Sequence, residues 1–128
     1  MLALAGFATG CGATGSNSSS SFTGPKKDVA GAVEDLESAA RKSDEAKICT
    51  DLLSSRLIGT FRATGKTCNK AISDALDDSD TFDLSVKSVT VSGSTASAVV
   101  QSKRKTGTDT FQLVKEGGVW KIASLGGA

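Results

Sequence analysis

Carboxylates in the C-terminal half of the chain are the side chains best suited to acid or base chemistry. The sequence has no histidine and no tyrosine, so the usual proton shuttle at neutral pH and the usual phenolic donor are both missing. Asp83 occupies the polar phase of a strand in which it alternates with Phe82 and Leu84. Asp109 neighbours Phe111 in a second expected strand. We expect both carboxylates to face solvent rather than act as general bases, and therefore expect a protein that is not an enzyme.

Several other kinds of site are excluded by residue type and spacing. No glycine-rich phosphate loop, nucleophile elbow or catalytic-cysteine motif is present. The acidic run "DDSD" at 77–80 lacks the ligand spacing of a calcium loop, and two cysteines without histidine cannot supply the usual four zinc ligands. The basic run "KRK" at 103–105 has no interleaved aromatic residues, and the net charge of the chain is only +1. We expect no metal, no cofactor and no nucleic acid partner.

The N-terminal stretch "LALAGFATGCG" at 2–12 is apolar and ends beside a cysteine. Small residues at 8–10 precede Cys11, and a Ser/Gly-rich tether follows it. This arrangement resembles the lipobox of bacterial lipoproteins, whose cysteine is diacylated and then exposed by cleavage. The stretch is well short of the ~20 apolar residues that a membrane-spanning helix needs.

The lipobox resemblance implies an anchored protein. Residues 1–11 would be the end of a signal peptide, residues 12–25 a linker, and Cys11 the lipidation site that holds the protein on the extracytoplasmic side of the cell membrane. Secretion without an anchor is the alternative localisation. No lysine or arginine precedes residue 26, so we interpret the basic part of the signal as lying upstream of Met1. The competing interpretation is a cytosolic protein with an incidental cysteine in its N-terminal tail.

Apolar residues at helical spacing predict three helices after the linker. The first begins at Asp28, a candidate N-cap, and buries Val29, Val33, Leu36 and Ala40. The second starts after Ser43 or Asp44, spans 45–61, and buries Ile48, Leu52, Leu53, Leu57 and Phe61. The third follows a break at Gly65 and an N-cap at Thr67, and its apolar face consists of Cys68, Ala71, Ile72, Ala75 and Leu76.

From Thr81 onward the apolar period drops to two, which predicts strands. The phase changes between Val86 and Val89, so we expect a bulge near Lys87 and Ser88. Glycine-containing turns then separate three further strands, at 95–102, 109–115 and 119–125. The pattern predicts an α+β domain over residues 26–128, with three N-terminal helices packed on a curved four-stranded antiparallel sheet.

The segments "VTVSGSTASAVV" and "DTFQLVKEGGVWKIASL" carry a family resemblance. Together with the N-terminal helices and the bent strand, they resemble the nuclear transport factor 2-like superfamily, and in particular its short secreted or lipid-anchored bacterial members. The resemblance covers roughly residues 26 to 125. It implies a cone-shaped domain, either filled by side chains or holding a hydrophobic ligand, whose core or pocket is lined by Phe61, Phe82, Phe111, Leu113, Trp120 and Ile122.

Cys49 and Cys68 remain once Cys11 is assigned to lipidation. In an oxidising compartment such an even pair favours a disulfide. Short bacterial members of the superfamily often carry a similar pair. The alternative is two reduced core thiols, since Cys68 lies on the apolar face of its helix.

These features favour an envelope lipoprotein with a non-enzymatic domain. Its partners would be the membrane, through the lipid on Cys11, and either another envelope protein or a small apolar ligand. An inhibitory or accessory role toward an envelope enzyme fits the same features. The alternative function is a small isomerase or cyclase-like enzyme with an Asp base inside the cone.

Overall fold

Glycine and proline mark the start of the first helix. The computed structural model describes residues 21–78, 84–102 and 107–125. Within them α1 (Pro25–Arg41) has Gly24 at the N-cap position, with a φ of 61°. Proline suits the first helical position because its missing N–H would have no intrahelical partner there. The prediction that Asp28 caps this helix is wrong, since Asp28 lies within its first turn.

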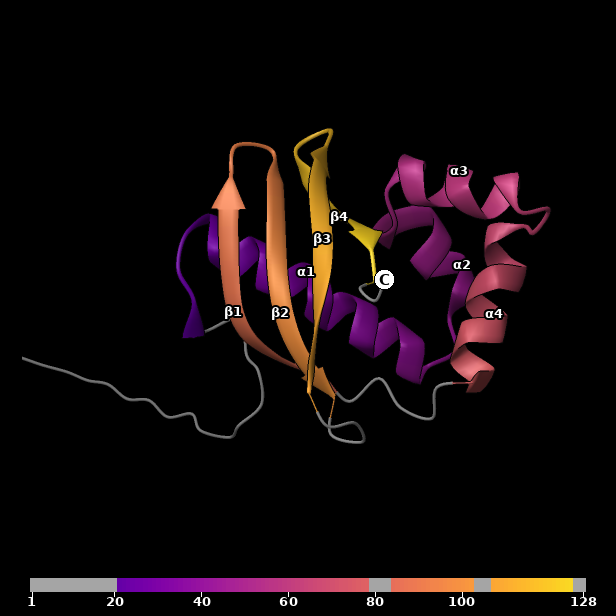
Figure 1. The fold of residues 1–128 in the computed structure, drawn as a ribbon, viewed down its shortest axis with the longest axis horizontal. Helices are drawn as coiled ribbons and strands as arrows, with labels where there is room; N and C mark the ends of the chain where they lie inside the picture. The colour runs from indigo at the N-terminus through magenta and orange to yellow at the C-terminus, as the bar shows by residue number, and fades with distance from the viewer. Residues whose placement is uncertain (1–20, 79–83, 103–106, 126–128) are drawn as a thin grey trace, which may run out of the picture.

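The apolar stripe of α1 packs against the sheet. Figure 1 shows this helix running behind the strands, across one face of the sheet. The stripe predicted from the sequence is confirmed, because its four residues are all buried, as are two further alanines: Val29, Val33, Leu36 and Ala40, with Ala30 and Ala39. Because alanine is small, the helix axis can approach the strands closely.

The prediction of a single helix over residues 45–61 is wrong. The structure divides this stretch into α2 (Glu45–Lys47), the π-helical turn η2 (Ile48–Leu52) and α3 (Ser55–Ala63). The predicted start is confirmed, since the Asp44 side chain accepts the N–H three residues on at 3.1 Å. The predicted third helix is α4 (Cys68–Asp78), with the Thr67 hydroxyl accepting a first-turn N–H at 3.2 Å. The described residues thus contain four α-helices where three were expected.

The interruption lies at Leu53 and Ser54, which pair with the last strand. Leu53 forms an isolated parallel β-bridge with Ile122, and the Ser54 N–H donates to the Ile122 carbonyl at 2.8 Å. The Ser54 hydroxyl then accepts the Leu57 N–H at 3.1 Å and so caps α3. Backbone pairing with a distant strand and a local serine cap together outweigh continuation of the helix.

The strands form an antiparallel meander in the order β1-β2-β3-β4. Their bounds are β1 (Leu84–Ser92), β2 (Thr95–Ser102), β3 (Thr108–Glu116) and β4 (Val119–Ser124). The three later strands match the prediction to within one residue at each end. The predicted bulge is confirmed, since the β1–β2 register shifts between Val86 and Ser88. A bulge bends its strand, which contributes to the curvature of the sheet around α1.

One core joins α1, η2 and the inner face of the sheet. Its least exposed side chains come from all three layers: Val29 and Val33 from α1, Ile48 from η2, and Val100, Leu113 and Ile122 from the strands. Figure 1 shows α2, α3 and α4 grouped beyond β4, at one end of the sheet. Among the described residues, no helix has both the length and the apolar character needed to cross a bilayer.

Candidate functional site

Residues predicted to line a core or pocket belong mainly to the core. Four of the six are buried, with exposures of 6% or less: Phe111, Leu113, Trp120 and Ile122. Phe61, on α3, is only partly buried and packs against the core from outside. Phe82 lies outside the described residues. The inner face of the sheet is therefore filled by side chains, and a small-molecule site has to lie at its margin.

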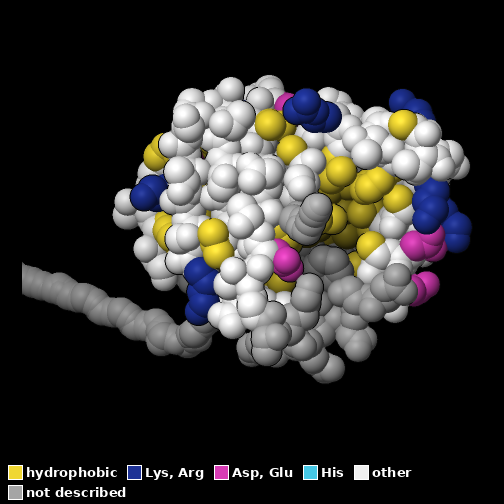
Figure 2. Space-filling view, in the orientation of Figure 1, with side chains coloured by type: hydrophobic (Ala, Val, Ile, Leu, Met, Phe, Trp, Pro, Cys, Tyr) yellow, Lys and Arg dark blue, Asp and Glu magenta, His cyan; other side chains and the backbone are white. Residues whose placement is uncertain are grey.

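An apolar hollow occupies that margin. Figure 2 shows hydrophobic side chains gathered in a recess between the β3–β4 side of the sheet and the helices α3 and α4. The partly buried hydrophobic residues of these elements that pack against the core include Leu57 and Phe61 on α3, Leu76 on α4, and Leu125 after β4. Exposed apolar surface that is concave and continuous with the core is typical of small-molecule sites. We call this recess the apolar hollow.

Contacts from the β3–β4 hairpin hold both the start of α3 and the end of η2. Glu116, at the end of β3, accepts the Ser55 N–H at 3.2 Å and the Ser55 hydroxyl at 3.1 Å. Lys121 on β4 donates to the Asp51 carbonyl at 2.7 Å. Together with the Ser54–Ile122 hydrogen bond, they attach the lobe formed by α3 and α4 to the edge of the sheet. We call residues 55–78 the α3–α4 lobe.

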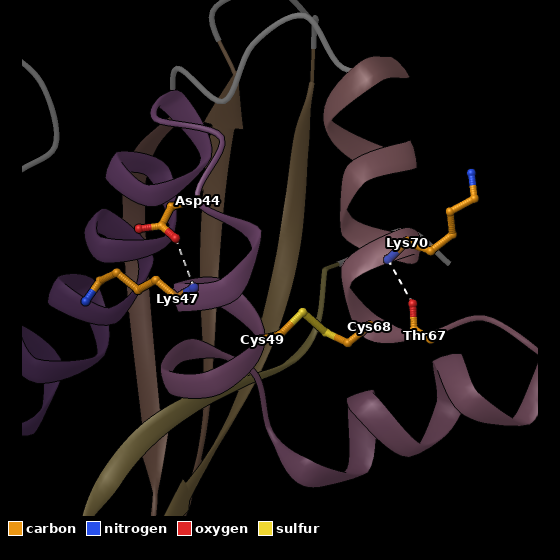
Figure 3. Close-up of a disulfide and its surroundings, with 6 residues drawn as sticks. All are labelled: Asp44, Lys47, Cys49, Thr67, Cys68 and Lys70. Carbon is orange, nitrogen blue, oxygen red and sulfur yellow. Dashed lines mark hydrogen bonds between the residues drawn. A yellow bond between two sulfur atoms is a disulfide. The ribbon is translucent and has the colours of Figure 1, made fainter.

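A disulfide attaches the far part of this lobe to η2. Cys49 in η2 and Cys68 at the start of α4 are bonded, with an S–S distance of 2.04 Å and a Cα–Cα distance of 6.0 Å. The pairing predicted from the sequence is therefore present in the structure. Figure 3 shows the bond lying between the two capped helix starts, at Asp44 and Thr67. The crosslink holds α4 beside the core, where propensity alone would not keep so short a helix.

Asp74 on α4 organises the turn that precedes this helix. Its carboxylate accepts hydrogen bonds from Lys66 at 2.9 Å and from Lys70 at 3.0 Å. The Lys66 hydrogen bond, followed by that from Lys70, lowers the pKa of Asp74 below its ordinary value of 3.8. The stabilisation is therefore fully present above pH 3.8 and is lost as the pH falls through the lower pKa of the folded state.

Asp109 lies on the helix-facing side of the sheet. It is the register partner of Val100, which is 1% exposed, and it lies two residues before the buried Phe111. Directly paired residues share a face, and so do alternate residues of one strand. Asp109 is half-buried as a result, and the expectation that it faces solvent is wrong. Asp83 lies outside the described residues.

Metal binding has no support among the described residues. They contain no group of three or more Cys, Asp and Glu side chains placed to hold a metal ion. The acidic run begins at the end of α4, and its residues 79–80 lie outside the described residues, as do the basic run at 103–105 and Cys11.

The layered α+β architecture, the bulged meander and the margin hollow define a cone-fold domain of the nuclear transport factor 2-like type. A family model described as "Putative lumazine-binding" matches residues 59–125, from within α3 to the end of β4. The match covers more than half of the chain, and the protein belongs to this family. No match was found among curated proteins or among solved structures.

Sequence reasoning missed the attachment of the lobe to the sheet. The apolar positions from Ile48 to Phe61 continue at helical spacing through the break, so periodicity gives no sign of it. The available signal was Ser54, a preferred N-cap residue placed three positions before Leu57. Glu116 and Lys121, whose partners lie far away in the sequence, carried no local signal.

The disulfide should contribute about 3 kcal/mol to the free energy of unfolding, since it closes a loop with a sequence separation of 19. With Cys11 replaced by Ser in every protein, the Cys49→Ala/Cys68→Ala double variant should lose that amount in urea unfolding. The exposed neighbour change Thr50→Ala, as control, should shift stability by less than about 0.5 kcal/mol. Equal stability of the double variant and its parent, or a parent mass that does not rise by two hydrogens on reduction, would contradict the assignment.

Proposed function

We propose that this domain binds a small, flat, largely apolar ligand in the apolar hollow and does not transform it. The hollow itself is the observation that carries the proposal: Figure 2 shows hydrophobic side chains in a recess beside α3 and α4, helices whose partly buried hydrophobic residues pack against the core. The lobe that walls the hollow is attached to the sheet at Ser54 and to η2 by the disulfide. Such attachment reduces the ordering that a ligand would otherwise have to impose.

The family description supports a heteroaromatic ligand. Lumazine is a flat bicyclic compound, and an aromatic face such as that of Phe61 suits a ring of this shape. The domain would release its ligand unchanged, because the whole sequence lacks histidine and tyrosine. Binding of an envelope protein over the same hollow is the other form of this role.

A second function, an isomerase or cyclase-like enzyme, is favoured by one observation. Asp109 shares the helix-facing side of the sheet with Phe111, where a half-buried carboxylate could act on a ligand that reaches in from the margin of the sheet. Turnover of a bound ligand that Asp109→Asn abolishes would favour the enzyme over the binding domain.

Anchoring at the membrane completes the proposed role. In this interpretation residues 1–11 end a signal peptide, Cys11 carries the lipid, residues 12–25 are a tether, and the domain begins near residue 26. The Ser/Gly-rich composition of the tether supports it, since such linkers are flexible. The domain would then present its hollow on the extracytoplasmic side of the cell membrane, with secretion as the alternative.

Lumazine should bind the purified protein in isothermal titration calorimetry, and Phe61→Ala should weaken binding about tenfold by removing an aromatic contact. Val91→Ala is the matched control, because Val91 is a partly buried hydrophobic residue on β1, at the edge of the sheet opposite β4. It should change the dissociation constant by less than about twofold. An absence of heat, or equal weakening by both variants, would contradict binding in the apolar hollow.

Mass spectrometry of the mature protein from membrane fractions should find Cys11 as an acylated N-terminal residue. Cys11→Ser should move the protein out of the membrane fraction, because the proposed anchor is then lost. Cys49→Ala/Cys68→Ala, which also removes cysteine but leaves the lipidation site, should keep any folded protein in that fraction. An unmodified Met1 on protein recovered from the soluble cytosol would rule out the anchored form.

A further inference from the structure

A second concave site lies away from the apolar hollow. It is a cleft of about 560 Å³ between α1, the end of η2 and the β3–β4 hairpin. None of the hydrophobic residues named for the apolar hollow lines it. We call it the α1–hairpin cleft, and its lining combines an apolar floor with charged walls.

The floor of the cleft is formed by small and apolar residues. Gly31 and Ala32 come from α1, Leu52 from η2, and Trp120 from β4. Leu52 and Trp120 are buried parts of the core, at 8% and 6% exposure, so the floor is fixed by the packing of the domain. A rigid floor of this kind can receive the apolar body of a small molecule.

Carboxylates outnumber ammonium groups on the walls. Asp28, Asp35 and Asp51 line the cleft, against Lys27 and Lys115. The first two carboxylates are seven residues apart on α1 and therefore lie on one face of that helix, on either side of its small residues. Within the described parts of the chain they have no ion-pair partner, whereas Asp51 pairs with the Lys47 ammonium at 3.8 Å. On the α1 side the two carboxylates outnumber the Lys27 ammonium by one, so the net charge there is negative.

Trp120 already holds a cation. The Lys115 ammonium lies 5.5 Å from the centroid of the indole ring, a cation–π contact made by an exposed side chain. The indole Nε1 of Trp120 is buried and, among the described residues, is the side-chain donor left without a hydrogen-bond partner. A buried donor without a partner costs free energy, so the core beside the cleft is incompletely satisfied at this indole.

We propose that the α1–hairpin cleft binds a small organic cation, with its ammonium group between the α1 carboxylates and the Trp120 ring. The ligand would also carry an apolar body for the floor of the cleft. The Lys115 ammonium occupies part of this position in the free protein and swings into solvent when the ligand binds. This role is additional to binding in the apolar hollow and does not depend on it.

L-Leucinamide is a suitable probe because it combines an ammonium, an isobutyl group and an amide oxygen. At about pH 6 its amine is protonated. Trp120 is the sole tryptophan of the sequence, so its fluorescence reports on the cleft directly. We expect a saturable change in Trp120 fluorescence with L-leucinamide. N-acetyl-L-leucinamide keeps the isobutyl group and the amide oxygen but lacks the positive charge, and should cause no such change.

Variants with the same change in net charge distinguish an effect of the cleft carboxylates from a general effect of protein charge on binding. Asp28→Asn/Asp35→Asn should weaken L-leucinamide binding about tenfold, because both carboxylates that face the ammonium are neutralised. Glu45→Gln/Asp77→Asn, on α2 and α4, changes the net charge by the same two units but lies outside the cleft lining, and should leave affinity within about twofold. These changes are all on helix surfaces, so circular dichroism should report an unchanged fold.

Removing Lys115 should have the opposite effect. Lys115→Met should strengthen L-leucinamide binding about three- to tenfold, because the cation that competes for the Trp120 ring is gone. Lys87→Met, an exposed lysine of β1, gives the matched loss of one positive charge and should change affinity by less than about twofold. The proposal is overturned if L-leucinamide and its N-acetyl derivative bind alike, if neither binds, or if Lys115→Met has no more effect than Lys87→Met.

Discussion

The hydrogen bond from the Ser54 N–H to the Ile122 carbonyl is the constraint on which the arrangement of the helices depends. It forces the backbone at Leu53 and Ser54 into an extended conformation, ends η2, and allows the Ser54 hydroxyl to cap α3. Ser54 is fully buried, so its polar atoms need these partners. A continuous helix through this point would lose the Leu53–Ile122 bridge and leave the Ile122 carbonyl without the Ser54 N–H.

That constraint leaves a recess at the margin of the sheet rather than a second packed layer. The α3–α4 lobe is held by the sheet near Ser54 and by the disulfide at Cys68. The recess that Figure 2 shows beside this lobe is the apolar hollow. The inner face of the sheet is filled by residues such as Phe111 and Trp120 and lies under α1. On the hairpin side, Trp120 also forms part of the α1–hairpin cleft. The same strand therefore borders two sites of different chemistry, one apolar and one charged.

Local patterns predicted the strands, the bulge, the caps at Asp44 and Thr67, and the buried stripe of α1, because alternation and helical spacing are recorded in neighbouring residues. The break at Ser54 was missed because its cause, Ile122, lies in the last strand and leaves the local apolar spacing unchanged. Asp109 was placed on the wrong face, although it precedes Phe111 by two residues and so shares its phase. There the polarity of the side chain was given more weight than its position in the strand.

Amide hydrogen exchange in Ser54→Pro tests the role of this hydrogen bond most directly. Proline fits the φ of −72° at residue 54 but has no N–H to give to Ile122, whereas Ser54→Ala keeps the N–H and loses only the cap. Ser54→Pro should accelerate exchange throughout α3 and α4 by more than about tenfold relative to Ser54→Ala, while protection of the β1–β2 amides changes little. Equal exchange in the two variants would contradict the claim that the Ser54–Ile122 bond positions the lobe.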